Sequence, residues 1–208
     1  MEKNDIKANN KKMLNFLIKN DFKNKYAGSF LGVFWAFVQP VVIILLYWFV
    51  FQIAFGSGDE DGAPFVLWLM AGLVPWFFFS EAWMNATSSF IEYSYLVKKV
   101  VFDIKLLPFV KVASSLYVHV FFVFVMIVCY AAAGRFPGLI IIQLLYYSIC
   151  LFLIVLALSY FTSAIAVFFK DVTQIINILM TIGIWVTPIM WNITRINGKS
   201  VLQFILRL

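Results

Sequence analysis

An uncharged apolar run from residue 31 to residue 55 is the feature that most constrains how this chain can fold. At a rise of about 1.5 Å per residue, roughly 20 apolar residues cross the ~30 Å hydrocarbon core of a bilayer. The run is therefore long enough to span a membrane. The chain of 208 residues is 63% hydrophobic and 12% charged, whereas a soluble domain is about half apolar and a quarter charged. Both observations predict a membrane protein.

Four further apolar runs follow, each bounded by charged or turn-forming residues. We expect five transmembrane helices, at about residues 31–55, 64–86, 112–133, 139–169 and 175–191. Pro40 lies inside the first run and removes one backbone donor, so the helix either kinks there or begins its regular part there. The fold class predicted from these runs is an all-α integral membrane protein.

The segment before the first span is basic and amphipathic. Residues 1–12 form a polar tail, and from Met13 to Tyr26 apolar residues recur at helical spacing opposite lysines and asparagines. We predict an amphipathic helix over residues 13–29 that lies in the headgroup plane of the membrane. The alternative is a solvated helix that contacts a soluble partner.

The distribution of basic residues predicts the orientation of the chain. Twelve of the 16 Lys and Arg residues lie in the N-terminal segment, in residues 92–111 and at Lys170. These segments all fall on one side if five spans are present, and cytoplasmic loops are enriched in Lys and Arg. The N-terminus is therefore predicted to be cytoplasmic, and the membrane lipids to be direct partners of the chain.

Few residues in the sequence have a pattern typical of catalysis or metal binding. The single histidine, His119, lies inside a span and is interpreted as a buried polar residue rather than a ligand. Cys129 and Cys150 are interpreted as small buried apolar residues. The sequence has no Gly-rich phosphate loop with its lysine, so we expect no cofactor on this chain, and the basic residues do not form a nucleic-acid-binding face. A membrane enzyme would need converging acids, but the candidates are scattered: Glu81, Glu92, Asp103 and Asp171.

Two blocks of residues carry a resemblance to a known family. The first block consists of Lys25-Tyr26, Gly28, Leu31-Gly32, Trp35, Pro40 and residues 47–51. The second consists of residues 61–65, Trp68, Gly72-Leu73 and residues 76–80. Together they resemble the permease subunit of ABC-2 type exporters for lipid-linked polysaccharides, which include O-antigen and wall teichoic acid permeases. The second block is most similar to the teichoic acid branch.

The resemblance implies an export function and several partners. It implies outward movement of a lipid-diphosphate-linked polysaccharide across a bacterial plasma membrane by a permease homodimer, with ATP hydrolysed on separate ATPase subunits. It also implies six spans, so the sixth is expected to be missing and residues 192–208 to be a truncated external segment. The chain departs from the family pattern at Lys170-Asp171, where Arg-Asp is common, and at Asp103, where Pro is common. A membrane enzyme remains the alternative, while an ion channel lacks the expected rings of intramembrane charge.

If the exported lipid carries a diphosphate near the headgroup plane, residues of the amphipathic segment 13–29, which we call the gate helix, lie at the right depth to contact it. Lys19, Lys23 and Lys25 are predicted to contact the diphosphate and Tyr26 the first sugar, with Gly28 and Gly32 as the hinge. The alternative is that the lysines only attract anionic lipids. Some aromatic residues could line a conduit, although most should lie in interfacial belts. The candidates are Trp35, Tyr47, Trp48 and Trp76.

The cytoplasmic loop at residues 92–111 is the expected contact with the ATPase. By resemblance it contains a coupling helix with Tyr93, Leu96 and Val97 on an apolar face, beside Lys98 and Lys99. The alternative is a basic loop that follows the positive-inside rule, which explains the lysines but leaves the apolar face unexplained.

Overall fold

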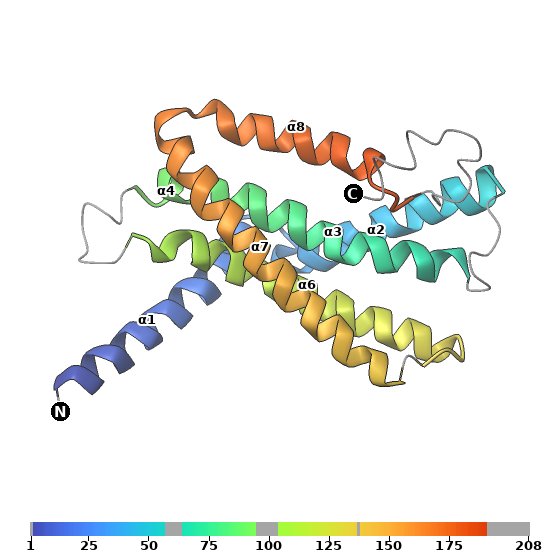
Figure 1. Ribbon diagram of the computed structural model, residues 1–208, viewed down its shortest axis with the longest axis horizontal. Helices are drawn as coiled ribbons and strands as arrows, with labels where there is room; N and C mark the ends of the chain where they lie inside the picture. The colour runs from blue at the N-terminus through green and yellow to red at the C-terminus, as the bar shows by residue number, and fades with distance from the viewer. Residues whose placement is uncertain (1, 57–63, 95–103, 137, 191–208) are drawn as a thin grey trace.

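The computed structural model describes residues 2–56, 64–94, 104–136 and 138–190, and within these ranges its regular elements are all helices. Figure 1 shows long helices running between two ends of the molecule, with α1 leaving the bundle at one of them. The elements are α1 (Glu2–Lys25), η1 (Gly32–Phe34), α2 (Trp35–Trp48), η2 (Phe49–Ala54), α3 (Phe65–Thr87), α4 (Ser89–Glu92), α6 (Leu106–Ala132), η3 (Gly138–Ile140), α7 (Ile141–Phe168) and α8 (Asp171–Val186). The all-α class predicted from the sequence is confirmed.

Among the described residues, four helical stretches are long and apolar enough to cross a membrane. They are Gly32–Ala54, Phe65–Thr87, Leu106–Ala132 and Ile141–Phe168. The first, second and fourth coincide within two residues with the spans expected at 31–55, 64–86 and 139–169. Pro40 lies inside α2 and does not begin it, since the helix starts at Trp35. The chain is therefore a multi-pass membrane protein.

The third span begins earlier than the sequence predicted. Residues 92–111 were expected to be a loop because Lys111 ends a charged stretch, but α6 starts at Leu106 and contains Lys111. The side chain of Lys111 is only 13% exposed and forms ion pairs with Asp21 and Glu92. A buried charge is compatible with a continuous helix when it is paired in this way.

The fifth predicted span, residues 175–191, is represented by the shorter helix α8. Its 16 residues correspond to about 24 Å, less than the ~30 Å hydrocarbon core. The helix ends at Val186, and Thr187 has an extended backbone with φ −72° and ψ 142°. Pro188 disfavours helical geometry at the residue that precedes it, so the proline explains this end.

The N-terminal helix is longer than the predicted amphipathic segment at one end and shorter at the other. It begins at Glu2, so the polar tail predicted at residues 1–12 is continuous with the helix, and it ends at Lys25. Gly28 and Gly32 both have positive φ, of 93° and 49°. Because side chains with a Cβ rarely adopt these angles, the two glycines allow the turn between α1 and the first span.

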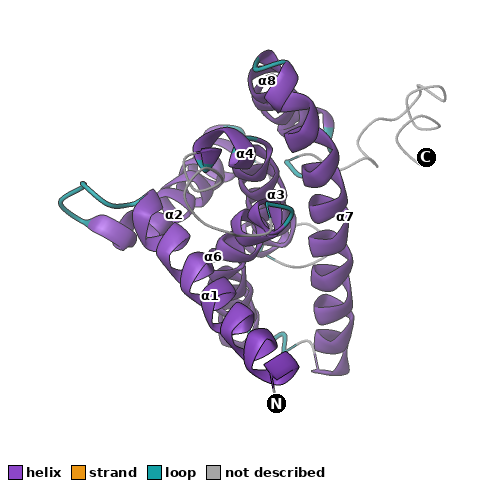
Figure 2. Ribbon diagram, turned by 90° about the vertical axis from the view of Figure 1, so that its left-hand side faces the viewer, coloured by secondary structure: helices purple, strands orange, loops and turns teal. Residues whose placement is uncertain are grey.

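Helix α3 lies at the centre of the fold. In Figure 2, α7 lies on one side of α3 and α6, and α2 lies on the other. The buried residues of α3 include Leu69, Leu73 and Phe78, which belong to two apolar clusters that α3 shares with its neighbours. Phe22 of α1 and Tyr26, which follows α1, pack on a third cluster around Phe122 of α6. Helix α1 is therefore attached to the bundle along part of its apolar face.

Helix α7 packs through a stripe of mostly small residues. Its buried residues are Val155, Ser159, Thr162, Ser163 and Ala166. Thr162 accepts a hydrogen bond from the indole N–H of Trp83 at 3.2 Å, and its hydroxyl lies 2.8 Å from that of Thr87. Small residues and interhelical hydrogen bonds stabilise helix pairs inside membranes, so this stripe fixes α7 against α3.

The first span ends in a π-helix, η2. The backbone N–H of Phe55 donates to the carbonyl of Val50, five residues back, at 3.0 Å. Such segments are rare and often lie at functional sites. Here the ring of Phe51 lies 6.2 Å from that of Phe65, so η2 packs against the start of α3.

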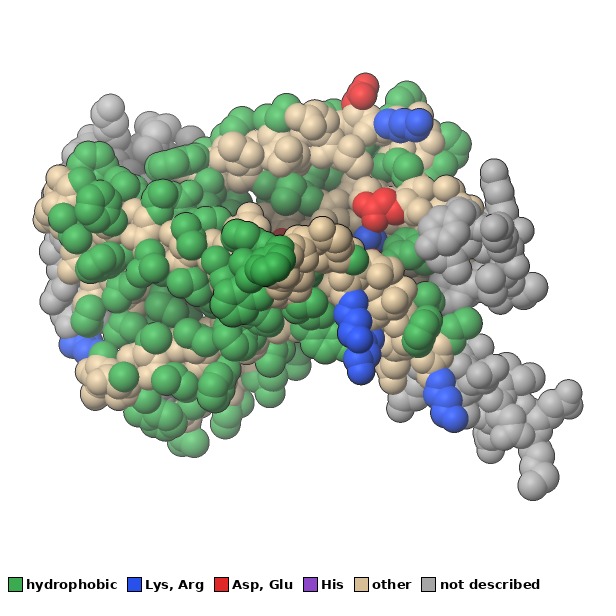
Figure 3. Space-filling view, turned by 180° about the vertical axis from the view of Figure 1, so that it is seen from behind, with side chains coloured by type: hydrophobic (Ala, Val, Ile, Leu, Met, Phe, Trp, Pro, Cys, Tyr) green, Lys and Arg blue, Asp and Glu red, His purple; other side chains and the backbone are tan. Residues whose placement is uncertain are grey.

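Charged side chains are concentrated at one end of the molecule. The space-filling view in Figure 3 shows a mostly hydrophobic surface, with blue and red groups gathered toward the end where α1 leaves the bundle. We call this the α1 end. It contains the residues predicted to contact the substrate headgroup, which lie at and just after the end of α1.

Candidate functional site

Lys25, the last residue of α1, forms an ion pair with Glu81 of α3. The two side chains are 32% and 27% exposed. Glu81 lies inside the second span, where a charged side chain without a partner is unfavourable. The pair therefore holds the end of α1 against α3. Because of this ion pair, the ammonium of Lys25 could bind a phosphate only by separating from Glu81 or by contacting both groups at once.

Tyr26 lies next to this pair. The ammonium of Lys25 is 5.5 Å from the centre of the Tyr26 ring, which is close enough for a cation–π contact. Burial, followed by the negative charge of Glu81, raises the pKa of Tyr26 above its ordinary value. The phenol therefore remains neutral at physiological pH, with a hydroxyl that can donate or accept a hydrogen bond.

The other two predicted headgroup residues are at the surface. Lys19 and Lys23 are exposed, and both lie on the same helix as Lys25. The structure thus brings Lys25 and Tyr26 together beside Glu81, and leaves Lys19 and Lys23 at the surface of α1. Exposed lysines of this kind can attract either a phosphorylated ligand or anionic lipids.

Asp21 is a functional candidate that the sequence interpretation missed. It is only 5% exposed and accepts hydrogen bonds from the hydroxyl of Tyr93 at 2.5 Å and from that of Ser114 at 2.6 Å. The ammonium of Lys111 lies 3.0 Å from the carboxylate. Asp21 thus connects α1 to α6 and to the residue that follows α4.

A second carboxylate completes this group of charges. Glu92, the last residue of α4, accepts a hydrogen bond from Lys111 at 2.5 Å and another from Ser88 at 2.5 Å. Lys111 also lies 5.1 Å from the centre of the Tyr93 ring. One partly buried lysine, with its side chain 13% exposed, therefore joins two carboxylates that come from different segments of the chain.

The sequence contained a signal that could have identified Asp21. It lies four positions after Leu17 and three after Ile18, so it falls on the apolar stripe of the amphipathic helix. A carboxylate at such a position needs a partner when the stripe is buried. The identity of the partner, Lys111, could not be inferred because it lies 90 residues away.

Only part of the predicted ATPase contact lies among the described residues. Tyr93 is described, and it donates its hydroxyl to Asp21. Leu96, Val97, Lys98 and Lys99 lie outside the described residues. The coupling role of these four residues therefore stays a prediction.

The four candidate conduit aromatics lie in different environments. Trp35 is 43% exposed at the start of α2, and the ring of Tyr47 lies 6.3 Å from that of Trp185 in α8. Trp48 packs against the cluster around Leu69. Trp76 fits closely against Gly183, where an added Cβ would come within 2.8 Å of its ring. Trp76 and Tyr47 thus contribute to contacts with α8, and a role in a conduit stays a prediction for all four.

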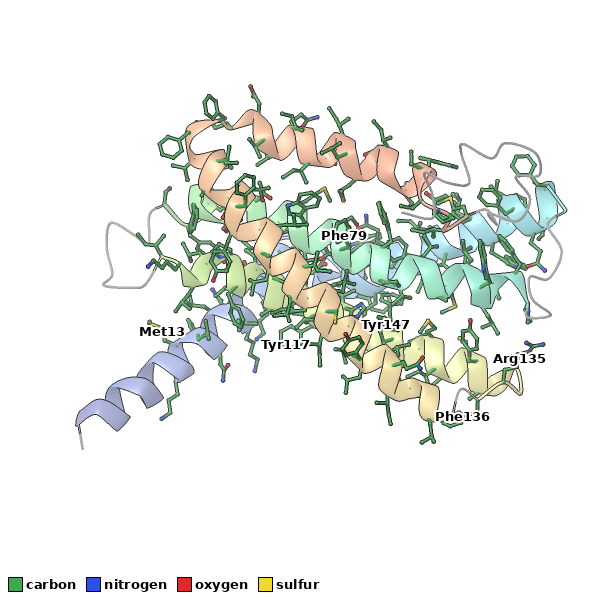
Figure 4. All side chains as sticks on the ribbon, viewed as in Figure 1. Met13, Phe79, Tyr117, Arg135, Phe136 and Tyr147 are labelled. Carbon is green, nitrogen blue, oxygen red and sulfur yellow. The ribbon has the colours of Figure 1, made fainter. Side chains whose placement is uncertain are left out.

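A separate cavity of about 850 Å³ lies between α3, α6 and α7. His119 and Ser148 line it, and the Nε2 atom of His119 is 3.2 Å from the hydroxyl of Ser148. At 5% exposure, His119 is buried, as the sequence predicted. The cavity is also lined by Arg135, Phe136 and Tyr147. In Figure 4, Arg135 and Phe136 lie at the end of the molecule that is far from Met13 of α1. None of the four conduit candidates is among the lining residues.

The acidic residues that an enzyme would require are engaged separately in the described part of the chain. Glu81 pairs with Lys25, whereas Glu92 pairs with Lys111. Asp171 is exposed at the start of α8, and Asp103 lies outside the described residues. The structure therefore does not bring Glu81, Glu92 and Asp171 together as a catalytic group.

Comparison with known proteins gives a consistent result over nearly the whole chain. The ABC-2 type transporter family matches residues 13–208. The chain is similar to the O-antigen export system permease protein RfbA of Myxococcus xanthus, with 29% identity over 200 residues that cover 92% of this chain and 73% of that protein. It is also similar to two proteins of the same name from Klebsiella pneumoniae, each with 23% identity, 90% of this chain covered and 71% of the relative.

Proposed function

Because the chain belongs to the ABC-2 type transporter family, we propose that it is the membrane-spanning permease of an ATP-driven polysaccharide exporter. The exported molecule is a polysaccharide of the O-antigen or teichoic acid type linked to a lipid diphosphate. It moves from the cytoplasmic to the outer side of a bacterial plasma membrane. ATP is hydrolysed on a separate ATPase subunit, and two copies of the permease form the complex.

The observation that supports this proposal most strongly is the extent of the family match. It covers the basic residues of α1 from position 13 onward together with the four apolar spans. The relatives that align over about nine tenths of the chain are named as O-antigen export permeases. The alternative of a membrane enzyme is not favoured by these matches.

In this proposal, each predicted residue of the α1 end has a role. Lys19 and Lys23 attract the diphosphate at the surface of α1, because lysine binds phosphate as a flexible point charge. Lys25 can then exchange Glu81 for the phosphate. Tyr26 presents an uncharged aromatic ring to the first sugar. The turn through Gly28 and Gly32 allows α1 to move relative to the first span.

The direction of transport requires the α1 end to face the cytoplasm. Lys25, Lys111 and Lys170 belong to segments at this end, whereas Arg135 lies at the opposite end of α6. This distribution follows the positive-inside rule.

Cysteine labelling in intact cells tests this orientation. A cysteine introduced by Ser57→Cys should react with an impermeant thiol reagent added outside, because it follows the first span, and one introduced by Ser94→Cys should react only after the cells are opened. Both variants should carry Cys129→Ala and Cys150→Ala so that only the new thiol is detected. Labelling of Ser94→Cys, but not of Ser57→Cys, in intact cells would contradict the cytoplasmic placement of the α1 end.

Transport itself can be measured in inverted membrane vesicles that contain the permease and its ATPase. We expect a radiolabelled lipid-linked polysaccharide to become protected inside the vesicles when ATP is added, and not when a non-hydrolysable analogue replaces it. Vesicles that contain the ATPase alone are the control. If the permease instead alters the glycan chemically without moving it, the membrane-enzyme alternative is correct.

A further inference from the structure

The buried carboxylate of Asp21 contacts two separate parts of the bundle. It accepts hydrogen bonds from Tyr93, which follows α4, and from Ser114 of α6, and it pairs with Lys111 of α6. With three partners and 5% exposure, the carboxylate is fully engaged. Replacing the partners by water would require α1 to lift away from the bundle, because both carboxylate oxygens face protein groups.

The position of Asp21 determines which way the lysines of α1 face. Lys19 and Lys23 each lie two residues from Asp21, so they are about 200° away from it around a helix of 3.6 residues per turn. This places them on the side opposite the buried carboxylate, and the structure shows both as exposed. A rotation of α1 that releases Asp21 would therefore turn the lysines toward the bundle.

The same carboxylate is in contact with the first residues of the loop at 92–111, which is the predicted ATPase contact. Tyr93 donates directly to Asp21, and its neighbour Glu92 reaches Asp21 through their shared partner Lys111. Neighbouring residues of one segment are thus tied to the same point on α1. A shift of Glu92 and Tyr93 would pull on α1 through charge-assisted hydrogen bonds, which are stronger than neutral ones.

We propose that Asp21 is a positioning residue for export, which couples the placement of the Glu92–Tyr93 segment to the orientation of the lysines on α1. This inference rests on the proposed export function. Asp21 itself does not contact the substrate, because its carboxylate is buried among protein groups. The competing explanation is that Asp21 only anchors α1 to the bundle. Its replacement would then lower the amount of folded permease without changing the amount of polysaccharide exported per ATP.

The test uses the full permease with its ATPase and compares Asp21→Asn and Tyr93→Phe with the control Asp171→Asn. The control removes a carboxylate from an exposed position at the start of α8. Three quantities are measured: the amount of permease in the membrane, the rate of ATP hydrolysis, and the amount of polysaccharide exported per ATP. A spin label on Asn24→Cys, at an exposed position of α1, reports the mobility of this helix in the purified permease, with both native cysteines replaced by alanine.

We expect Asp21→Asn to keep ATP hydrolysis within about twofold of the unaltered complex. Export per ATP should fall by about tenfold or more in both Asp21→Asn and Tyr93→Phe, the equivalent of about 1.4 kcal/mol. The spin label on α1 should become more mobile in both variants. The control Asp171→Asn should change neither export per ATP nor the mobility of the label. The double variant should be little worse than Asp21→Asn, because both substitutions weaken the same contact between Tyr93 and residue 21.

Two results would overturn the proposal in different ways. If the unaltered permease exports but export per ATP is unchanged in both variants, Asp21 is only a structural anchor, whatever the amount of protein in the membrane. If the unaltered permease and its ATPase export nothing, the proposed function fails and the positioning role fails with it. The conservative variant Asp21→Glu keeps the carboxylate, so it should recover part of the export per ATP that Asp21→Asn loses. No recovery would also argue against the proposal.

Discussion

The double charge exchange Lys25→Glu/Glu81→Lys is expected to restore the membrane level that either single change lowers, but not to restore export. Each single change places like charges next to each other at a site where the two side chains are only 32% and 27% exposed. Two like charges about 4 Å apart repel by roughly 4 kcal/mol at an effective dielectric constant of about 20. The double exchange recreates an ion pair with its polarity reversed, so α1 should again be held against α3.

Export should nevertheless remain low in the exchanged protein because position 25 then carries a carboxylate. Loss of a charge-assisted hydrogen bond typically removes about 1.5–3 kcal/mol, and 1.4 kcal/mol corresponds to about tenfold. We therefore expect export per permease molecule to fall by about tenfold or more. Transport into inverted vesicles, normalised to the permease content of the membrane, measures this effect.

A matched variant separates the two roles of Lys25. Lys23 is exposed on the same helix, so Lys23→Glu should leave the membrane level unchanged and reduce export. Full recovery of export in the charge-exchanged protein would mean that Lys25 contributes only its ion pair with Glu81. Wild-type export by both Lys23→Glu and the charge-exchanged protein would leave the attraction of anionic lipids as the explanation for these lysines.

The second large effect is expected at the predicted ATPase contact. The combined substitution Leu96→Asp/Val97→Asp should abolish co-purification of the ATPase while the permease still inserts into the membrane. Burial of one Leu or Val side chain contributes roughly 1.5–3 kcal/mol, and two buried carboxylates would add a desolvation cost. A fall in affinity of at least a hundredfold, or about 2.8 kcal/mol, is therefore expected, and pull-down followed by titration of the purified ATPase measures it.

The basic-loop alternative makes a different prediction for the same segment. If Lys98 and Lys99 only set orientation, Lys98→Gln/Lys99→Gln should alter topology, and Leu96→Asp/Val97→Asp should leave ATPase binding intact. If the segment is a coupling helix, the apolar pair should dominate binding and the lysine pair should change it less. Normal co-purification of the Leu96→Asp/Val97→Asp variant would remove the assignment.

The sequence predicted the membrane fold well because hydrophobic length is a local property. The spans at 31–55, 64–86 and 139–169 agree with the helices of the structure, since each is a run of apolar residues with recognisable ends. The start of α6 was misplaced because Lys111 was treated as a solvent-exposed charge. Its position inside a helix depends on Asp21 and Glu92, which are distant in sequence.

The candidate site was predictable only in part, because its contacts join residues that are distant in sequence. Lys19, Lys23, Lys25 and Tyr26 could be placed on one basic helix from their spacing and from the family resemblance. The ion pair between Lys25 and Glu81 joins residues 56 positions apart, and no local pattern specifies it. Asp21 was missed, although its position on the apolar stripe marks it as a carboxylate that needs a partner.

The π-helical end of the first span has a consequence for chain length. A segment in which Phe55 bonds five residues back, rather than four, holds one residue more than an α-helical turn would need. Removal of one residue between Phe49 and Ala54 would allow an ordinary α-helix, whereas removal of one from α2 would rotate every preceding side chain by about 100° relative to its neighbours. Single-residue length differences among relatives should therefore be better tolerated in η2 than anywhere else in this span.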